Sequence, residues 1–281
     1  MASEHYISMY LASLKVENYS PLTIENYRYQ LAAFSDFLGE TSMLRATTMH
    51  VREYLAHHQH LKASTIVTKL DVISGFYNWL ILEEEILKNP CAKIKRPKLP
   101  KKVKSGLTIV ELEQVRNSCK TVRERALIEV FYSTGCRLDE LRKLNIEDID
   151  WSSQSVLVFG KGSKERRVFL SDKASWYLRK YLKSRTDDCE ALFATVRTPI
   201  RRLTNDGIAY QIRKIKEASG IERDLTPHIM RHTFAQLSLD NGMKLEDLQS
   251  LMGHESPATT MRYAESSDER KQMAFKMHHA Q

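Results

Sequence analysis

A basic segment containing prolines limits what this chain can fold into, because it separates two stretches that each have their own hydrophobic pattern. Residues 88–104 read Lys-Asn-Pro-Cys-Ala-Lys-Ile-Lys-Arg-Pro-Lys-Leu-Pro-Lys-Lys-Val-Lys and contain no acidic residue. Proline lacks a backbone N–H and fixes φ, so the segment cannot form one continuous helix, and its like charges repel one another. We therefore expect an extended linker over residues 88–106, an N-terminal domain over 1–87 and a larger C-terminal domain over 107–281.

The positive charge of the chain is concentrated in the same segment. Its eight lysine and arginine residues account for the whole formal net charge of +8. Such a concentration indicates a polyanionic partner, and we expect the segment to lie along a DNA phosphate backbone. The alternative is a solvated tether whose charges only improve solubility. The expected DNA-binding residues are Lys93, Lys95, Arg96, Lys98, Lys101, Lys102 and Lys104.

The N-terminal stretch has the apolar spacing of four amphipathic helices. In the first, apolar residues follow the i, i+3, i+4, i+7 pattern from residue 7 onward. The second is predicted to begin at Ser20-Pro21, since serine caps a helix and proline suits its first turn. Thr47 or Thr48 begins the third, and Ser64 or Thr65 caps the fourth.

The C-terminal stretch mixes helices with one β-hairpin. A capping box at residues 108–111 starts its first helix, and an apolar helix ends at Gly135, where glycine allows a left-handed cap. Residues 156–159 and 167–170 predict two strands joined by a cationic tip over 160–166. Further helices are expected after Ser171, over 206–219, after Thr226-Pro227, over 245–252 and from Pro257. The predicted fold class is mainly α, with a four-helix N-terminal domain and a larger α+β domain that contains a small hairpin or sheet.

Several classes of protein are excluded by what the sequence lacks. No segment approaches the ~18 consecutive apolar residues of a membrane span, and the N-terminus has no secretion-signal pattern. The cysteines at positions 91, 119, 136 and 189 fit neither a CxxC zinc site nor a disulfide scaffold, so we expect them to be reduced. We expect a cytoplasmic protein with no membrane partner, no metal and no cofactor.

Residues 228–263 hold groups that can break a phosphodiester through a covalent tyrosine. Such a transesterification needs a nucleophile, cations that neutralise the non-bridging oxygens, and a proton for the leaving oxygen. Tyr263 is the candidate nucleophile. The planar forks of Arg137 and Arg231 suit bidentate contact with phosphate.

Three further residues are candidates for moving protons. Lys161, at the hairpin tip, can protonate the departing 5′ oxygen. His228 shares a helical face with Arg231 and can accept the tyrosine proton, and His254 can donate to a non-bridging oxygen.

Each candidate has an ordinary structural alternative. A tyrosine near a helix end is usually part of a core or a surface. His228 and His232 have the i, i+4 spacing of a metal-binding pair, but Ile229 occupies the place of a metalloprotease glutamate. Arg137 can be a helix-start cation paired with Glu140, and we expect that pair whether or not Arg137 is catalytic. Lys161 is hard to separate from Lys164 or Arg166, since hairpin tips are commonly charged.

The joint order of these motifs resembles that of the tyrosine recombinases, also called phage integrases, over nearly the whole chain. The shared pattern is Arg137, Lys161, His228-x-x-Arg231, His254 and Tyr263 nine residues later. The resemblance implies that these six residues are catalytic and that the N-terminal helices form a SAM-like core-binding domain. Within the family, the chain is most similar to the compact Xer-like members. Small departures, such as Met230 where leucine is commoner, remove no reactive group.

The resemblance also implies the reaction. Tyr263 would form a 3′-phosphotyrosine and release a 5′ hydroxyl, and a partner duplex would complete strand exchange through a Holliday junction. The implied partners are double-stranded DNA recombination sites and further copies of the chain, in a tetramer on two sites, with or without a second recombinase. The task is open between resolving chromosome or plasmid dimers, resolving cointegrates of a transposable element, and integrating mobile DNA. We expect residues 267–281 to dock on a neighbouring subunit through Met273, Phe275 and Met277.

Two other functions fit parts of the same sequence. A type IB topoisomerase-like enzyme would share the chemistry but reseal the same strand. A non-catalytic DNA-binding regulator would share the basic linker and the helices but would not need the phenol. A recombinase exchanges strands between two duplexes, and a topoisomerase-like enzyme does not. A recombinase also forms a covalent complex with DNA, and a non-catalytic regulator does not.

Overall fold

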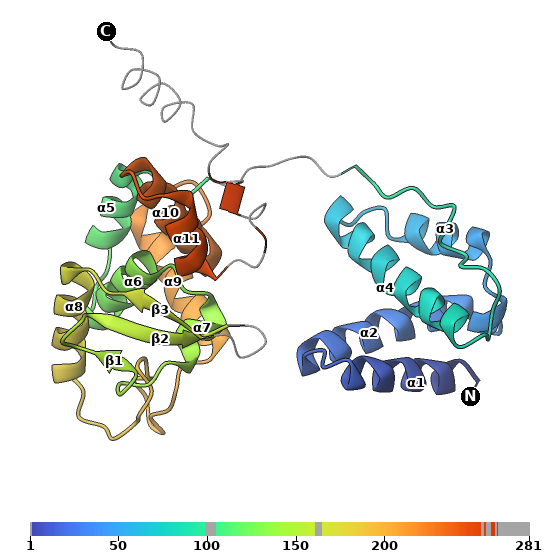
Figure 1. Cartoon of the computed structure of the whole chain (residues 1–281), viewed down its shortest axis with the longest axis horizontal. Helices are drawn as coiled ribbons and strands as arrows, with labels where there is room; N and C mark the ends of the chain where they lie inside the picture. Colours follow the sequence, from blue (N-terminus) through green and yellow to red (C-terminus); the bar gives the residue numbers. More distant parts are fainter. Residues whose placement is uncertain are drawn as a thin grey trace, which may run out of the picture. The chain divides into compact units, whose positions relative to one another are not determined.

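The structure, a computed structural model, describes residues 2–98, 105–160, 165–253, 256, 260, 261 and 263. The chain divides into two compact units, residues 1–101 and 102–281. Both are mainly helical, and the second also contains a small antiparallel sheet (Figure 1). The predicted fold class is therefore confirmed. None of the helices within the described ranges is long and apolar enough to cross a bilayer.

Over residues 2–98, the first unit consists of four helices around one core. They are α1 (Ala2–Val16), α2 (Pro21–Leu38), α3 (Thr48–His57) and α4 (Ala63–Leu82), with a 3-10 turn, η1 (Met43–Arg45), between α2 and α3. Phe34, Phe76 and Tyr77 are buried in the core. The start of α2 is as predicted, because the Ser20 side chain accepts a hydrogen bond from the N–H of Thr23.

The start of α4 differs from the prediction. The N-cap residue is Lys62, which makes no side-chain capping bond. Ser64 already lies in the first turn, where its carbonyl accepts from the Thr68 hydroxyl. The predicted cap by Ser64 or Thr65 is therefore wrong, because the helix begins before the first residue with a capping side chain.

The first part of the basic segment packs on the first unit and is not outstretched. Cys91 is buried in the core of this unit, and Ile94 packs against the same core. The Asn89 side chain accepts from the N–H of Cys91 and donates to the Ser74 carbonyl, and the Pro90 carbonyl accepts from the Thr48 hydroxyl. The extended geometry predicted from residue 88 is corrected here, since an apolar thiol and three polar contacts hold this turn against the helices.

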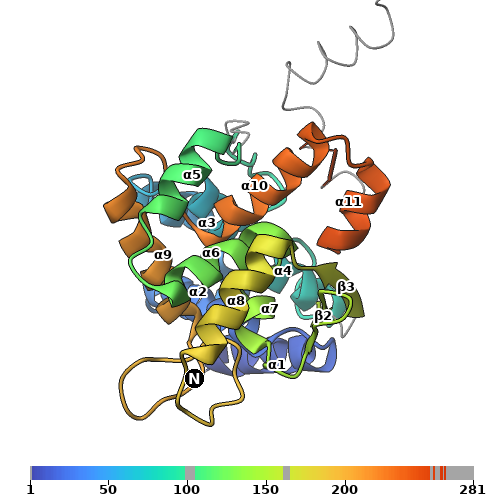
Figure 2. The ribbon, with the colours of Figure 1, turned by 90° about the vertical axis from the view of Figure 1, so that its left-hand side faces the viewer.

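The second unit contains seven helices and three strands within its described residues. In chain order they are α5 (Ile109–Asn117), α6 (Val122–Thr134), α7 (Leu138–Lys143), β1 (Ile149–Asp150), β2 (Ser155–Phe159), β3 (Glu165–Phe169), α8 (Asp172–Lys183), α9 (Asn205–Ser219), α10 (Pro227–Asp240) and α11 (Leu245–Met252). The buried α6 packs against both α8 and α10, and α10 packs against α11 (Figure 2). This packing brings the end of α6, the start of α7 and the middle of α10 together.

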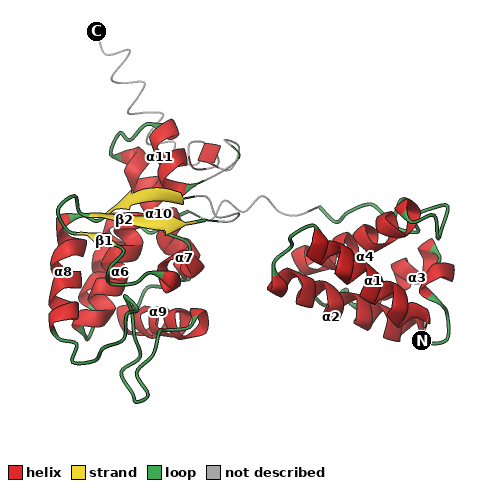
Figure 3. Ribbon diagram, turned by 60° about the horizontal axis from the view of Figure 1, so that its bottom comes forward, coloured by secondary structure: helices red, strands yellow, loops and turns green. Residues whose placement is uncertain are grey.

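The sheet has the order β1-β2-β3 and is antiparallel throughout (Figure 3). Val156 faces Val168 across the predicted hairpin, and both are buried. Strand β1, which is only two residues long, was not predicted from the sequence. Arg166 was expected in the hairpin tip, whereas β3 already begins at Glu165. Arg166 therefore belongs to the strand, where pairing with β2 fixes its direction.

The junction between α6 and α7 depends on Gly135. This residue caps α6 in the left-handed region, at φ +58°, as the sequence predicts. A Cβ at this position would lie 2.2 Å from Cδ1 of Phe234 on α10. Only glycine therefore allows α10 to lie against the end of α6, and this packing places Arg231 close to Arg137.

The described part of the second unit starts with a short segment fixed to α10. The N–H of Gly106 donates to Oε1 of Gln236 at 2.9 Å, and the N–H of Leu107 donates to Oγ1 of Thr233 at 2.8 Å. A Cβ on Gly106 would lie 2.5 Å from Cα of Thr233. These contacts tie the chain to α10 just before the predicted capping box, in which Thr108 and Glu111 cap each other reciprocally.

Candidate active site

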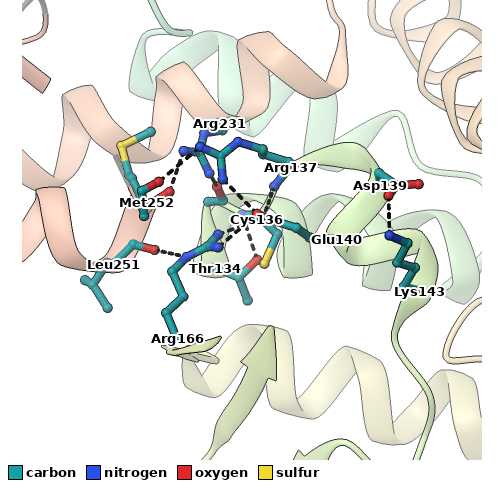
Figure 4. Close-up of polar contacts among 12 residues, drawn as sticks. Thr134, Cys136, Arg137, Asp139, Glu140, Lys143, Arg166, Arg231, Leu251 and Met252 are labelled. Carbon is teal, nitrogen blue, oxygen red and sulfur yellow. Dashed lines mark hydrogen bonds and ion pairs between the residues drawn. The ribbon is translucent and has the colours of Figure 1, made fainter. Parts of the chain in front are cut away.

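The two arginines singled out in the sequence meet at the C-terminal turn of α11. Arg231, on α10, donates from Nη1 to the Gly135 carbonyl at 2.6 Å and from Nη2 to the Met252 carbonyl at 2.7 Å. Arg137, at the start of α7, donates from Nη2 to the Gly253 carbonyl at 3.1 Å. Residues 94 positions apart in the sequence thus bind neighbouring carbonyls (Figure 4).

A buried carboxylate joins Arg137 to a third arginine. Glu140 accepts from the N–H of Arg137 at 2.7 Å and from its Nη1 at 2.8 Å. The same carboxylate accepts a two-pronged contact from Arg166, at 2.9 and 2.7 Å. The expected pair of Arg137 with Glu140 is present. Arg137, Arg166, Arg231 and Glu140 are called the arginine cluster below.

Charge and burial in the arginine cluster change the pKa of three of its members. Burial by itself lowers the pKa of Arg166, but its hydrogen bonds to Glu140 raise it above its ordinary value. Burial by itself raises the pKa of the Glu140 carboxyl, but hydrogen bonds from Arg166 and Arg137 lower it to about 2. Burial lowers the pKa of Arg231 to about 10, and the charge of Arg137 acts in the same direction. With three guanidiniums around one carboxylate, the cluster carries a net positive charge that favours an anion.

Exposure distinguishes the arginines from one another. The Arg137 side chain is 40% exposed, whereas that of Arg166 is 10% exposed. Arg231 as a whole is 5% exposed. The Arg231 guanidinium is therefore buried, because the last turn of α11 covers it and accepts its hydrogen bond.

The Tyr263 phenol lies against α10 and bonds to an imidazole of that helix. Its oxygen is 2.6 Å from Nδ1 of His232, and the two ring centroids are 5.3 Å apart. The His228 ring packs edge-on against His232, with centroids 5.8 Å apart. The tyrosine ring also packs against the small apolar cluster of Phe234, Ala235, Leu248 and Met252, between α10 and α11. The phenol is thus held near Arg231, with which it interacts electrostatically.

The structure does not describe every predicted site residue. Lys161 and His254 lie outside the described residues, as do Lys101, Lys102, Lys104 and the tail residues Met273, Phe275 and Met277. In the sequence, Lys161 falls between the described ends of β2 and β3, and His254 directly follows Gly253. The Gly253 carbonyl accepts from Arg137, and the second residue of β3 is Arg166, a member of the arginine cluster.

The described lysines and arginine of the basic segment belong to the first unit. Lys93, Lys95, Arg96 and Lys98 are exposed. Arg96 forms an ion pair with Asp71 of α4 at 2.8 Å. Arg96 would therefore have to share or leave that carboxylate in order to bind a phosphate.

Two residues of the site were not among those selected from the sequence. His232 was considered only as part of a metal pair, and Arg166 only as a charge at a hairpin tip. No group of three or more His, Cys, Asp or Glu side chains within the described part of the chain is arranged to hold a metal ion. The signal for His232 was present, because helical periodicity places it near His228 and Arg231. No local signal distinguished Arg166, whose partners are 26 and 85 residues away.

Comparison with known proteins gives matches over both units. Residues 107–270 match the phage integrase family, and residues 7–84 match the phage integrase N-terminal SAM-like domain. The tyrosine recombinase XerC of Halalkalibacterium halodurans is 32% identical, over 99% of this chain and 98% of that protein. The tyrosine recombinase XerC of Treponema denticola is 30% identical, over 99% of each.

Solved structures with related folds cover almost the whole chain. The XerA recombinase is 27% identical and superposes with a TM-score of 0.58, over 99% of each chain. A lambda integrase dimer bound to a COC′ core site superposes with a TM-score of 0.79 at 20% identity, over 96% of this chain and 97% of that chain. A lambda integrase tetramer bound to a Holliday junction gives 0.75 at 21% identity, over 90% of this chain and 77% of that chain.

Proposed function

Because the chain belongs to the phage integrase family and is a site-specific tyrosine recombinase, we propose that Tyr263 is the nucleophile that cleaves DNA and that Arg137 and Arg231 bind the scissile phosphate. The observation that carries this proposal is the meeting of both guanidiniums at the α11 turn, next to the helix that holds the phenol. Two fixed cations beside a positioned phenol are what attack on a phosphodiester needs. The positive charge comes from the arginines, so we propose that no metal ion or cofactor takes part.

Residues of this chain can supply every group that the cleavage step needs. The Tyr263 oxygen forms a bond to phosphorus, the bond from phosphorus to the 5′ oxygen breaks, and a 3′-phosphotyrosine results. The phenol proton passes to an imidazole of α10, and Lys161 protonates the departing 5′ oxygen. His254 donates a hydrogen bond to a non-bridging oxygen. Energy of the phosphodiester is kept in the phosphotyrosine, so rejoining needs no nucleotide.

The imidazole that accepts the phenol proton is proposed to be His232. The sequence indicated His228 for this role, but it is His232 whose Nδ1 lies 2.6 Å from the phenol oxygen. That distance is within the hydrogen-bonding reach required of a general base. His228, packed on the edge of the His232 ring, would orient it.

The second half of the reaction involves a second duplex and further copies of the chain. We propose that the free 5′ hydroxyl of a partner duplex attacks the phosphotyrosine, so that exchange of strands passes through a Holliday junction. The lambda integrase tetramer on such a junction supports four copies of this chain on two sites. The proposed tasks are the resolution of dimers or cointegrates, or the integration of mobile DNA, in the cytoplasm.

The proposal is tested with a DNA duplex that carries a nick close to the cleavage position, so that the short cleaved fragment diffuses away and the covalent complex accumulates. The native protein is expected to form a covalent complex through the 3′ phosphate, and Tyr263→Phe is expected to bind the DNA without forming it. Tyr210→Phe, at an exposed tyrosine of α9, is the matched control and should behave like the native protein.

Each alternative function predicts a different result, either in this assay or in a strand-exchange assay with two duplexes. Binding without any covalent complex from the native protein would make the chain a regulator. A covalent complex without exchange of strands between two duplexes would make it a topoisomerase-like enzyme. A covalent complex formed by Tyr263→Phe would show that another residue is the nucleophile.

A further inference from the structure

The C-terminal turn of α11 is the point at which the arginine cluster is assembled. A helix leaves its last carbonyls without partners inside the helix and carries a partial negative charge there. In α11 three successive carbonyls are bound by three guanidiniums from three different elements. Leu251 accepts from Nε of Arg166 at 2.7 Å, Met252 accepts from Arg231 at 2.7 Å, and Gly253 accepts from Arg137 at 3.1 Å.

Arg166 differs from the other two arginines in what it binds. Its Nε contacts the Leu251 carbonyl, and both of its Nη atoms contact the carboxylate of Glu140. With its side chain 10% exposed, its fork is directed to protein groups. The backbone of Gly253 lies directly on this side chain, because a Cβ at Gly253 would be 3.0 Å from Cδ of Arg166. Arg166 thus joins β3 to the end of α11.

The ion pair between Arg166 and Glu140 determines how much of the positive charge of Arg137 is available to a ligand. Glu140 is buried, and one buried carboxylate can be neutralised by one guanidinium. While Arg166 holds the carboxylate in a two-pronged contact, the charge of Glu140 is offset without Arg137, and the 40% exposed side chain of Arg137 carries a positive charge in excess. Without Arg166, the carboxylate would be balanced by Arg137 alone, and the pair would have no net charge to offer a phosphate.

We propose that Arg166 is a positioning residue that neutralises Glu140 and thereby keeps the charge and direction of Arg137 available for the scissile phosphate. The proposal rests on the proposed function, since it concerns the phosphate at that same site. Arg166 itself touches no reacting atom. Its effect should therefore depend on the charge of the phosphate that Arg137 neutralises.

The test compares two nicked DNA substrates that differ only at the scissile phosphate. One has the ordinary phosphodiester, and the other has a methylphosphonate, in which a methyl group replaces one non-bridging oxygen and removes the negative charge. The variants are Arg166→Leu and, in case that change prevents folding, Arg166→Lys, which keeps a charge but lacks the planar fork. Arg167→Leu is the matched control, because Arg167 is the next residue of β3 and is exposed.

At saturating DNA, Arg166→Leu is expected to slow cleavage of the phosphodiester by about 10²-fold, the effect typical of a small misplacement of a catalytic group. Cleavage of the methylphosphonate is expected to change little, because it needs less positive charge. Adding Glu140→Gln to Arg166→Leu should recover part of the phosphodiester rate, since the uncharged amide no longer draws Arg137 away.

Two outcomes would overturn the inference while leaving the proposed function intact. One is equal slowing of both substrates, which would give Arg166 only a general structural role. The other is that Arg166→Leu cleaves the phosphodiester as fast as Arg167→Leu does. Failure of the native protein to form any covalent complex would instead remove the proposed function.

Discussion

The oxygen of Tyr263 lies 2.6 Å from Nδ1 of His232, although the two residues are separated by 31 positions in the sequence. His232 follows Arg231 directly on α10, so one turn of helix carries both a phosphate-binding candidate and the partner of the phenol. This relationship places the proposed proton acceptor on the same rigid element as a fixed cation. Transfer of the phenol proton would then require the Tyr263 side chain to lie against α10.

The first prediction concerns this hydrogen bond. His232→Gln should slow formation of the covalent complex by about 10²-fold at saturating DNA, the smaller effect expected when a general base is removed. Raising the pH should recover part of the rate, because a free phenol, with a pKa near ~10, loses its proton without help in alkaline solution. His228→Gln should slow the reaction less. The assignment to His232 fails if His228→Gln is the slower variant.

A second prediction concerns the glycine caps of α6 and α9. Both Gly135 and Gly220 have positive φ, +58° and +69°, but a Cβ would meet Phe234 only at Gly135. Gly220→Ala should destabilise the fold by about 1 kcal/mol, from backbone strain alone. Gly135→Ala should add about 1–3 kcal/mol from overpacking. Denaturant unfolding of both variants measures the difference, and equal destabilisation would show that the packing of α10 on Gly135 is not tight.

The third prediction is a pH dependence of stability that comes from Glu140. Its pKa falls from the ordinary 4.5 to about 2 in the folded protein. A lowered carboxyl pKa stabilises the fold fully above 4.5, and this stabilisation is lost as the pH falls toward 2. Between pH 4.5 and pH 3 the native protein should become less stable by about 2 kcal/mol through this site, given about 1.4 kcal/mol per pH unit.

Glu140→Gln should lack this part of the acid sensitivity, because an amide does not titrate. Its unfolding free energy should therefore fall less steeply below pH 4.5 than that of the native protein. Glu246→Gln, at an exposed position of α11, is the control and should follow the native curve. Identical slopes for Glu140→Gln and the native protein would contradict the prediction.

The fourth prediction concerns the basic segment. Changing Lys93, Lys95 and Lys98 to glutamine should flatten the dependence of log K on log salt by about 0.9 for each phosphate that is no longer neutralised. Arg96→Gln should have a smaller effect, because Arg96 already pairs with Asp71. An unchanged slope in the triple variant would show that these lysines form a solvated tether and do not lie along DNA.

Much of the local structure follows from the sequence because its causes are local. Ser20, Thr108 and Thr226 accept hydrogen bonds from backbone N–H groups three residues on, as their positions predict. The pair of Arg137 with Glu140 needs only one turn of helix. Contacts of this range depend on few degrees of freedom, so residue type and spacing are enough to predict them.

The parts that could not be predicted involve choices between equivalent groups. Lys62 rather than a serine caps α4, and Cys91 turns into the core where proline and lysine indicated an extended chain. Arg166 and Lys161 were equivalent as charges in one hairpin. Strand register decides the direction of Arg166, because β3 begins at Glu165 and directs Arg166 toward Glu140.

By itself, the sequence determined the helices, most of their caps and the fold class, since these depend on periodicity and on neighbours within one turn. Only the tertiary structure decided that three arginines share the end of α11, that Arg166 pairs with Glu140, and that His232 meets the phenol. Those contacts span 21 to 116 residues. They exist because α10 packs on α6 and α11, and the packing of whole elements selects which of several similar groups come within bonding distance.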